Sequence, residues 1–479
     1  MGTTEMKVKI VVLGAGPGGY VAAIRAAQLG GDVTVIEKEN VGGTCLNWGC
    51  IPSKIYKQSA DTLNSIKDSA SFCIDGISEG KLNLERLQER TKGIIASQSK
   101  GIHGLLAKNS ISYIGGEAKM SGSHSLSVTR KDGETEEVQF DKLIIATGST
   151  PMALPFLPFD GDRILSSDHI FSLKEIPESI TIIGGGVIGC EFACILQSFG
   201  VEVTLVEGLE RLLPLPSVEE ECSKLLLREM KKKKIKVELK TTLASASQKN
   251  GMVQLNLVSQ GKNGTEKAKQ IESEKVLVCI GRRASSASLD LDQAGVETTK
   301  RGWISTGANL QTTVPHIYAI GDVLGPERIM LAHTASTEAE IAAENCFGGA
   351  EEMNWQVMPS AIFTMPEIGC VGLSEAQAAE LYGKENIRAE SSLFRTLGKA
   401  QVIGELAGVT KIVCAKEDGK ILGIHIAGAH ATDLLGEATL AVSNGITAKQ
   451  LTKTIHAHPT LAEILLETAF KIEDMPLHG

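Results

Sequence analysis

Near its N-terminus the chain reads Val8-Lys9-Ile10-Val11-Val12-Leu13-Gly14-Ala15-Gly16-Pro17-Gly18-Gly19, and the architecture follows from these residues. The apolar, largely β-branched run at 8–13 predicts a buried strand. Residues 20–29 have a helical composition. Glycines between a strand and a helix let the backbone approach a pyrophosphate, whose charge the helix N-terminus stabilises. We therefore predict a strand, a turn and a helix that bind a dinucleotide.

An acidic residue follows at the spacing that such a unit requires. Val33 to Ile36 predict a second strand, and Glu37 ends it, 23 positions after Gly14. A carboxylate roughly 20 residues beyond the glycines binds a ribose hydroxyl. A glycine pattern alone is weak evidence, but strand, turn, helix, strand and acid in this order are specific.

The same pattern occurs a second time. A strand at Ile180 to Ile183 leads into Gly184-Gly185-Gly186-Val187-Ile188-Gly189, and a helix is predicted through Phe199. The next strand, residues 202–206, ends in Glu207, again 23 positions after the first glycine. Two such units imply two dinucleotides and electron transfer between them.

Glu207 also indicates which nucleotide the second unit binds. A carboxylate at this position accepts hydrogen bonds from a free 2′-hydroxyl and repels a 2′-phosphate. We therefore predict NAD rather than NADP. Arg211 is the residue that would serve a phosphate, but Glu207 and Glu210 surround it with negative charge.

Two cysteines separated by four residues follow the first unit, in the segment Gly42-Gly43-Thr44-Cys45-Leu46-Asn47-Trp48-Gly49-Cys50-Ile51-Pro52-Ser53-Lys54. A disulfide holds its Cα atoms roughly 4.4–6.8 Å apart, so Cys45 and Cys50 can bridge if the segment is bent or helical. Three interpretations are open: a static crosslink, a metal site or a reversible redox pair. So short a loop restrains the unfolded chain little, and no second cysteine pair lies nearby at metal-ligand spacing. We favour reversible redox chemistry.

The composition indicates a multidomain enzyme without a membrane or nucleic-acid partner. Its 479 residues suggest about three domains of roughly 150 residues each. The net charge of −9 argues against nonspecific binding to nucleic acid or an anionic membrane, and no apolar run reaches the roughly 18 residues of a spanning helix. The first residues contain neither a signal core nor a transit segment, so the cytoplasm is the default location unless an organelle signal was removed. The ten cysteines lack the spacing of a secreted framework, and apart from the redox pair we predict buried thiols.

A third group of candidate residues lies near the C-terminus, in His456-Ala457-His458-Pro459-Thr460-Leu461-Ala462-Glu463. Pro459 suits the first position of a helix, which would leave His458 at its mouth and Glu463 about one turn further along. That spacing lets a carboxylate orient an imidazole. A histidine there is often a cap or a surface residue, and His-x-His also occurs at metal sites. Combined with a redox pair that needs a base, His458 becomes the catalytic candidate and His456 a structural neighbour.

Together, the segment from Cys45 to Cys50, the paired nucleotide units and the His458-Pro459 segment resemble the pyridine nucleotide-disulfide oxidoreductases, over essentially the whole chain. The resemblance implies FAD, tightly bound at one per subunit, on the first unit, and NAD+ or NADH as a substrate on the second. The implied fold is α/β, with two Rossmann-like domains followed by an α+β dimerisation domain. The implied boundaries are residues 1–152 and 283–350 for the FAD domain, 153–282 for the NAD domain and 351–479 for the interface domain.

The resemblance also assigns cofactor contacts to individual residues. Those expected to bind FAD are Gly14, Gly16, Gly18, Gly19, Glu37, Gly43, Thr44, Lys54, Ala146, Thr147, Gly148, Gly321, Asp322, Ala332 and His333. Those expected to bind NAD are Gly184, Gly186, Gly189, Glu191, Glu207 and Gly281. Lys54 is expected beside the flavin, paired with Glu191, where its charge stabilises electron density on the ring. No metal is expected.

The reaction that the resemblance implies is the oxidation of protein-bound dihydrolipoamide with reduction of NAD+. Cys45 would exchange with the substrate dithiol, Cys50 would lie nearer the flavin, and His458, oriented by Glu463, would act as the base. The histidine and the glutamate would come from the second subunit of a homodimer. A helix N-terminus and a nearby cation are expected to lower the cysteine pKa values. The implied partners are the lipoyl domains of 2-oxoacid dehydrogenase or glycine cleavage complexes.

Other functions fit these residues less well. Glutathione-disulfide reductases would require arginines near the ribose of the second nucleotide, where this chain has Glu207. Mercuric reductases and high-molecular-weight thioredoxin reductases would require a C-terminal cysteine pair, but the last cysteine is Cys414. A non-enzymatic flavoprotein scaffold that binds NADH would need none of Cys45, Cys50 and His458.

Overall fold

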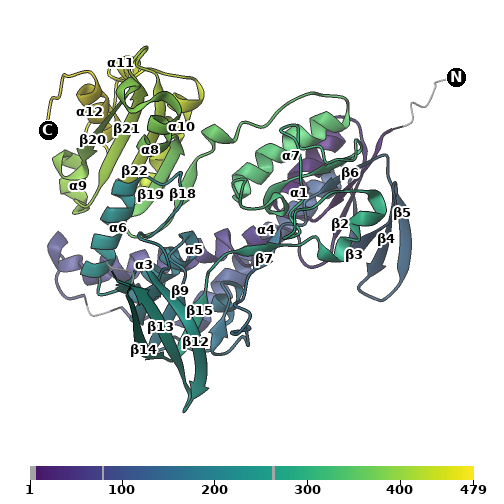
Figure 1. Cartoon of the computed structure of the whole chain (residues 1–479), viewed down its shortest axis with the longest axis horizontal. Coiled ribbons are helices and arrows are strands. Elements are labelled where there is room, and N and C mark those ends of the chain that lie inside the picture. The colour runs from purple at the N-terminus through teal and green to yellow at the C-terminus, as the bar shows by residue number, and fades with distance from the viewer. Residues whose placement is uncertain (1–6, 78–79, 262–264, 479) are drawn as a thin grey trace. The chain divides into compact units, whose positions relative to one another are not determined.

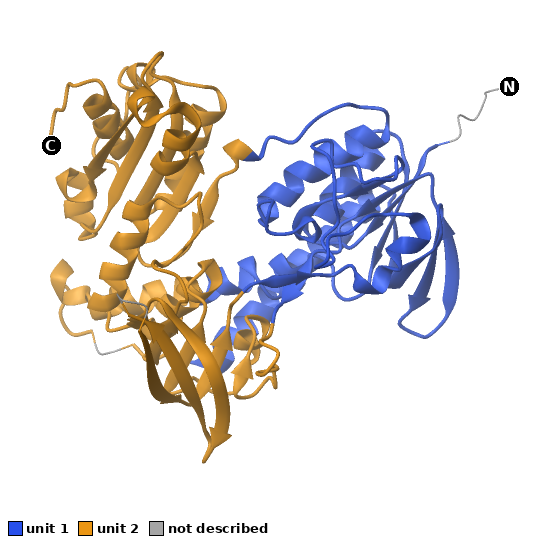
Figure 2. Ribbon diagram, in the orientation of Figure 1, with its two compact units in different colours: residues 1–56, 83–152, 281–355 blue, residues 57–82, 153–280, 356–479 orange. Residues whose placement is uncertain are grey.

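The structure is a computed structural model, and it describes residues 7–77, 80–261 and 265–478 (Figure 1). The chain divides into two compact units, which Figure 2 shows in blue and orange. Unit 1 combines Met1–Tyr56, Asn83–Met152 and Gly281–Trp355, and unit 2 combines Lys57–Leu82, Ala153–Ile280 and Gln356–Gly479. Within the described ranges, no helix is long and apolar enough to cross a membrane.

Unit 1 is built on a seven-stranded sheet with the strand order β17-β6-β1-β2-β3-β4-β5. The pairs from β17 to β3 are parallel, whereas β3, β4 and β5 pair antiparallel. Residues 10–13 of β1 are at most 2% exposed, as expected for a parallel strand covered on both faces. The bounds are β1 Lys9–Leu13, β2 Asp32–Glu37, β3 Ser112–Gly122, β4 Ser125–Arg130, β5 Thr135–Gln139, β6 Lys142–Ile145 and β17 Ile317–Ala319.

Two helices of unit 1, α1 (Pro17–Gln28) and α7 (Ala332–Cys346), pack against each other through small side chains (Figure 1). Their completely buried alanines are Ala22, Ala23 and Ala26 in α1 and Ala339, Ala342 and Ala343 in α7. A Cβ on Gly18 would lie only 3.2 Å from the carbonyl oxygen of Ala335. This close approach fixes α7 against the first turn of α1. The long helix α4 (Leu84–Lys108) completes the unit.

The first half of unit 2 repeats this design with a parallel sheet of order β11-β10-β9-β15-β8. A separate antiparallel sheet, β12-β13-β14, follows it in sequence. The bounds are β8 Ile164–Leu165, β9 Ser179–Ile183, α5 Val187–Ser198, β10 Glu202–Val206, α6 Glu220–Lys232, β11 Lys236–Glu238, β12 Thr241–Lys249, β13 Met252–Gln260, β14 Glu266–Ser273 and β15 Lys275–Val278. A short ladder of β7 (Ser149–Pro151) and β16 (Arg282–Ala284) joins the points where the chain leaves and re-enters unit 1.

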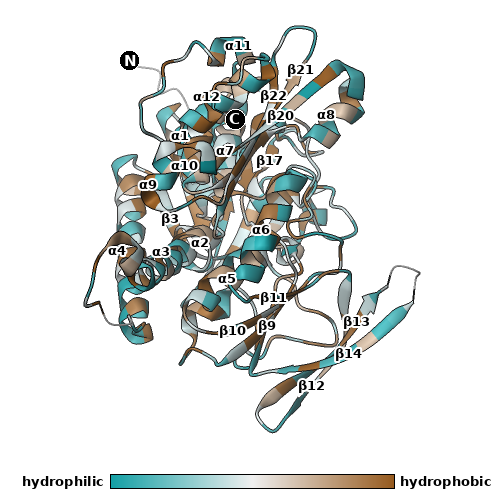
Figure 3. Cartoon of the chain, turned by 90° about the vertical axis from the view of Figure 1, so that its left-hand side faces the viewer, coloured by the Kyte–Doolittle hydropathy of each residue, from teal (hydrophilic) through white to brown (hydrophobic). Residues whose placement is uncertain are grey.

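The second half of unit 2 is an antiparallel sheet of order β18-β19-β22-β21-β20, combined with short helices. Figure 3 shows hydrophobic residues along its strands, and the central strands β21 and β22 are almost entirely buried. The bounds are β18 Ser360–Ile362, β19 Glu367–Gly372, α8 Glu375–Tyr382, β20 Ile387–Leu393, α9 Gly398–Ile403, β21 Val409–Ala415, β22 Ile421–Gly428, α10 Ala431–Ser443, α11 Ala448–Leu451 and α12 Glu463–Ile472.

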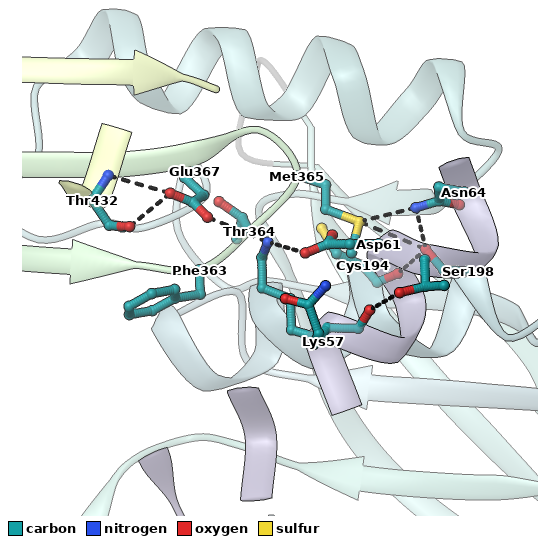
Figure 4. A network of polar contacts seen from close by, with 12 residues as sticks. Lys57, Asp61, Asn64, Cys194, Ser198, Phe363, Thr364, Met365, Glu367 and Thr432 are labelled. Carbon is teal, nitrogen blue, oxygen red and sulfur yellow. Dashed lines mark hydrogen bonds and ion pairs between the residues drawn. The ribbon is translucent and has the colours of Figure 1, made fainter. Parts of the chain in front are cut away.

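The helix α3 (Cys50–Lys67) begins in unit 1, and its later turns are anchored within unit 2 by a buried cation (Figure 4). The ammonium of Lys57 lies 2.8 Å from Asp61 and 3.3 Å from Glu367 of β19. Burial alone would lower the pKa of Lys57, but the two carboxylates raise it. Glu367 also accepts a hydrogen bond of 2.7 Å from the hydroxyl of Thr432 at the start of α10. The cation therefore ties α3 to the C-terminal sheet and its helix.

The predicted α/β fold class is confirmed, with two sheets of the nucleotide-binding type and a C-terminal dimerisation domain. The strand predicted at 202–206 has those bounds, and the helix predicted through Phe199 ends one residue earlier, at Ser198 of α5. The predicted helix start at Pro459 is wrong. The His458-Pro459 peptide bond is cis, and α12 begins only at Glu463.

Candidate functional site

The first glycine turn is tight because two of its glycines leave no space for a side chain. Gly14 has a φ of +95°, and a Cβ there would lie 2.4 Å from the carbonyl oxygen of Ala146. A Cβ on Gly19 would lie 1.9 Å from the carbonyl oxygen of Gly14. The turn ends at Gly16, the N-cap of α1, so the helix N-terminus faces the carboxyl end of β1. Backbone N–H groups and the helix dipole at such a position bind phosphate.

The second glycine turn has nearly the same geometry. Gly184 has a φ of +108°, and its Cβ would lie 2.3 Å from the carbonyl oxygen of Cys279. A Cβ on Gly189 would lie 2.0 Å from the carbonyl oxygen of Gly184. Gly186, the N-cap of α5, has open space where a side chain would be. Both turns thus present a bare backbone at the start of a helix.

Each turn is completed by a buried carboxylate at the end of the second strand. One oxygen accepts a backbone N–H from the glycine turn, and the other accepts the N–H of the residue two positions later. These bonds join Glu37 to Ala15 (2.7 Å) and Glu39 (2.7 Å), and Glu207 to Gly185 (2.6 Å) and Leu209 (2.8 Å). Both carboxylates are therefore fixed beside their turns, at the position expected for a ribose ligand.

Arg211, the cation that would serve a 2′-phosphate, is engaged elsewhere. The guanidinium of Arg211 donates to the carbonyl oxygens of Leu215, at 2.8 Å, and Val218, at 3.1 Å. Glu210 forms an ion pair with Lys240. These contacts support the prediction of NAD, because Glu207 is oriented by its own turn while Arg211 is held by the following loop.

The surroundings of the first turn fit a large cofactor. Gly43 has a φ of +56°, and a Cβ there would lie 2.7 Å from the Cα of Gly16. Gly148 has a φ of +70° with open space beside it, and the hydroxyl of Thr147 is buried without a protein partner. The segment that contains Thr44 therefore passes directly over the turn. A backbone surface without side chains, together with one buried hydroxyl that has no protein partner, fits FAD at these residues.

Asp322 is oriented by two residues that sequence reasoning did not single out as ligands. Its Oδ2 accepts a hydrogen bond of 2.7 Å from the Ser149 hydroxyl and lies 3.6 Å from Nε of Arg282. Arg282 in turn donates to the Ser149 hydroxyl and carbonyl, each at 2.6 Å. The signal for Arg282 was present in the sequence, since it follows Gly281 at the crossover, where φ is +133°.

A second missed residue is Glu338, which is 1% exposed on α7. Its carboxylate accepts the N–H of Gly321 at 2.6 Å and the indole N–H of Trp355 at 2.9 Å. Burial raises the pKa of Glu338. It thereby fixes the turn before Asp322, while Ala332 and His333 form the first residues of the same helix. A buried glutamate on a helix gives no pattern in sequence that distinguishes it from a surface residue.

The two cysteines lie at the junction of two helices, α2 (Gly43–Asn47) and α3. Cys45 lies inside α2, and Cys50 is the first residue of α3. Gly49 allows the two helices to approach, because a Cβ there would lie 3.0 Å from the carbonyl oxygen of Thr44. The bent helical segment that a short bridge requires is therefore present.

The two thiols have different electrostatic surroundings. The Cys45 thiol is hydrogen-bonded to Cys50, and this bond, burial and the charge on Cys50 raise the pKa of Cys45, although Lys54 lowers it. The prediction of a lowered pKa is therefore wrong for Cys45, because its neighbour outweighs the cation. Cys50 lies at the N-terminus of an 18-residue helix, where the helix dipole favours a negative charge. The helix N-terminus therefore favours negative charge on the sulfur of Cys50 over that of Cys45, which lies inside α2.

Lys54 lies one turn after Cys50 on α3, and its ammonium donates to the Ser53 hydroxyl at 3.3 Å. Glu191 lies on α5 and accepts the backbone N–H of Phe363 at 2.9 Å. The two residues belong to different units, and their predicted pairing stays a prediction.

His458 and Glu463 lie together in unit 2. The distance from His458 Nδ1 to Glu463 Oε1 is 2.9 Å, and the other carboxylate oxygen accepts the N–H of Thr460, also at 2.9 Å. The imidazole is 75% exposed, whereas the glutamate side chain is 19% exposed. A carboxylate fixed in this way holds the imidazole through Nδ1 and stabilises it when it is protonated.

The other cysteines differ in part from the prediction of buried thiols. Cys190, Cys194, Cys222, Cys346, Cys370 and Cys414 are buried. The prediction is wrong for Cys73, which is exposed at the end of a short 3₁₀-helix, and for Cys279, which is partly exposed beside the second glycine turn. In the parts of the chain that the structure describes, no group of three metal-ligating side chains converges.

Two family models match the chain. The model of pyridine nucleotide-disulphide oxidoreductases matches residues 8–339, and that of the dimerisation domain of the same family matches residues 358–469. The chain belongs to the pyridine nucleotide-disulphide oxidoreductase family. It is a flavoprotein oxidoreductase that uses FAD and NAD, and its dimerisation domain supports a homodimer.

Named relatives are similar to the chain over its whole length. A dihydrolipoyl dehydrogenase of Chlamydia trachomatis is 40% identical over 473 residues, which cover 98% of this chain and 97% of the relative. A dihydrolipoyl dehydrogenase of Bacillus subtilis is 38% identical, with 100% and 99% covered. The solved structure of LpdA from Mycobacterium tuberculosis matches with a TM-score of 0.88 at 26% identity, with 97% of this chain and 99% of that chain covered.

Replacing Glu207 should weaken the second nucleotide site selectively. In Glu207→Gln the charge that holds the ribose is lost while the shape is kept, so we expect the dissociation constant for NADH to rise roughly tenfold. Affinity for NADPH should fall less, because the repulsion of its phosphate is also removed. Fluorescence titration measures both constants. Glu210→Gln, an exposed acid three positions later, is the matched control, and equal effects of the two substitutions would contradict the assignment.

Proposed function

We propose that the protein oxidises protein-bound dihydrolipoamide and reduces NAD+, as the names of its relatives suggest. Support comes from full-length similarity to dihydrolipoyl dehydrogenases, together with the NAD-type carboxylate Glu207. The observation that carries the proposal is the placement of the two cysteines, with Cys45 inside α2 and Cys50 at the N-terminus of α3, where the helix dipole favours a negative charge. A pair of this kind exchanges disulfides through one sulfur and holds negative charge on the other.

The exchange half of the reaction is carried out by residues of this chain. His458 accepts a proton from one substrate thiol, and the thiolate attacks Sγ of Cys45 in the oxidised pair. A mixed disulfide forms, and the bond between the two cysteines breaks to leave Cys50 as a thiolate. The second substrate thiol then displaces Cys45, which closes the lipoamide disulfide. One substrate proton ends on Cys45 and the other leaves through His458, while two electrons remain on the cysteine pair.

The cofactors accept those electrons. When bound, FAD supplies the acceptor for the reduced cysteine pair, and NAD+ is the final hydride acceptor. Glu37, Asp322 and the first glycine turn would hold FAD, and Glu207 with the second turn would hold NAD. The positive charge of Lys54, one turn after Cys50, would stabilise electron density that arrives on the flavin.

We propose domains and a subunit arrangement in line with the family. Residues 1–152 and 283–350 form the FAD domain, 153–282 the NAD domain and 351–479 the interface domain. Unit 1 is assembled from separate stretches of the chain, which supports the assignment of a discontinuous FAD domain.

In the homodimer, His458 and Glu463 of one subunit complete the thiol site of the other. The exposed imidazole of His458 and the neighbouring Ile455, an apolar side chain that is 97% exposed, support an interface there.

The partners and the location are proposals of the same kind. The substrate dithiol would be carried by lipoyl domains of a 2-oxoacid dehydrogenase or glycine cleavage complex. We place the enzyme in the cytoplasm or in an organelle matrix, because free structural thiols suit a reducing compartment.

A direct assay tests the reaction. The purified protein should reduce NAD+ with dihydrolipoamide, and NADPH with glutathione disulfide should give no turnover, because Arg211 does not face a 2′-phosphate. The absorbance of NADH at its long-wavelength maximum reports the first reaction, and that of NADPH the second. Faster turnover with glutathione disulfide would replace the proposed function by that of a glutathione-disulfide reductase.

The roles of the two sulfurs can be separated by matched serine substitutions. With FAD bound and no reductant, Cys45→Ser leaves Cys50 as a thiolate, so long-wavelength charge-transfer absorption is expected at pH 8. Cys50→Ser leaves only Cys45 and should show no such absorption. Absorption in Cys50→Ser and none in Cys45→Ser would reverse the assignment of the flavin-side sulfur.

The base is tested by His458→Gln. We expect the rate of dihydrolipoamide oxidation to fall by roughly two or more orders of magnitude, with FAD content and NADH affinity unchanged. His430→Gln is the matched control, because His430 is also an exposed histidine whose Nδ1 lies near an acid, 3.4 Å from Asp433, and it is outside the proposed motif. Similar losses in both variants would exclude a specific role for His458.

A further inference from the structure

His456 differs from His458 in its surroundings, although only one residue separates them. The His456 side chain is 4% exposed, compared with 75% for His458. Both of its ring nitrogens have partners: Nδ1 lies 3.0 Å from the carbonyl oxygen of Thr454, and Nε2 lies 2.8 Å from Oε1 of Glu437 on α10. The two imidazoles therefore have different hydrogen-bonding constraints.

The partners of His456 determine its protonation state. A carbonyl oxygen can only accept a hydrogen bond, and so can an ionised carboxylate. Both ring nitrogens must then carry a hydrogen, and an imidazole with two N–H groups is a cation. The alternative is a protonated Glu437, but that side chain is 32% exposed, and a carboxyl group loses its proton at a lower pH than an imidazolium does. The hydrogen bond to Glu437, above all, raises the pKa of His456.

The charge of His456 acts on His458 through Glu463, the carboxylate that contacts its imidazole. The charged groups that face His456 are Glu437 from α10 and Glu463 from α12. Burial would raise the pKa of Glu463, but the N–H of Thr460 and the charges of His458 and His456 lower it. His478 also lies within electrostatic range of Glu463. Glu463 is thus within electrostatic range of His456, while its carboxylate lies 2.9 Å from Nδ1 of His458.

We propose that His456 is a permanently charged positioning residue, an imidazolium that keeps Glu463 ionised as the hydrogen-bond acceptor of His458 Nδ1. The two histidines then have separate functions. His456 supplies a constant charge, whereas His458 gains and loses the proton of the reaction. The kinetic consequence rests on the proposed function, but the charge of His456 does not.

The charge can be observed directly by ¹⁵N NMR of histidine-labelled, FAD-loaded enzyme, with His456→Gln used to assign the signals. At pH 7.5, about one unit above the ordinary pKa of an imidazole, we expect both nitrogens of His456 to remain protonated. In Glu437→Gln, the amide can donate to Nε2, so His456 should become neutral at this pH. A neutral single tautomer of His456 in the unmodified protein would overturn the proposal.

The pH dependence of dihydrolipoamide oxidation gives the second test. In His456→Gln, the loss of a fixed cation makes the pair of His458 and Glu463 easier to protonate. The acidic limb of the rate-versus-pH profile should therefore move to higher pH by roughly 0.5–1 unit. Lys449→Gln, which removes an exposed cation from the adjacent α11, should leave the limb unchanged. A lowered rate without a shifted limb would show a merely structural role. If the unmodified protein did not oxidise dihydrolipoamide but its His456 were charged in the NMR spectrum, only the proposed function would be contradicted.

Discussion

Both nucleotide sites depend on the contact between a glycine and a backbone carbonyl. A Cβ would lie 1.9 Å from an oxygen at Gly19 and 2.0 Å from one at Gly189, closer than any side chain packs. Only glycine therefore permits a turn tight enough to bring the N-terminus of a helix to the carboxyl end of the central strand. The carboxylates of Glu37 and Glu207 then bind the amides of these turns, so strand, turn and acid form one rigid element.

The thiol chemistry is built on the element that follows the first turn. Gly43 packs against Gly16, which places α2 over the turn, and Gly49 brings α3 close enough for the two cysteines to meet. The dipole of α3 favours charge on Cys50, whereas the hydrogen bond to Cys50 raises the pKa of Cys45. The asymmetry of the pair thus arises from its position at a helix junction, and not from a difference in residue type.

Local patterns in the sequence predicted much of this arrangement. Apolar runs, glycine turns and the spacing to Glu37 and Glu207 depend on neighbouring residues, so the parallel sheets and both carboxylates were predictable. The antiparallel additions β3-β4-β5 and β12-β13-β14 were not predicted, because exposed polar strands carry a weak periodic signal. The start of α12 was placed at Pro459, since proline suits a first helical position, but the chain makes a cis turn there. The contact of Arg282 was missed because its partner Ser149 is 133 positions away, and Glu338 because a buried glutamate on a helix has no distinguishing pattern in the sequence.

The two glycine turns are related by a constant offset in the sequence. Residues 14, 19 and 37 correspond to residues 184, 189 and 207, each 170 positions later. Because the two turns share their geometry, they do not by themselves distinguish a flavin nucleotide from a nicotinamide nucleotide. Selectivity must therefore depend on the features in which the two sites differ, which are α2 and α3 beside the first turn and the open space at Gly186 in the second. The redox pair of Cys45 and Cys50 follows only the first of the two turns.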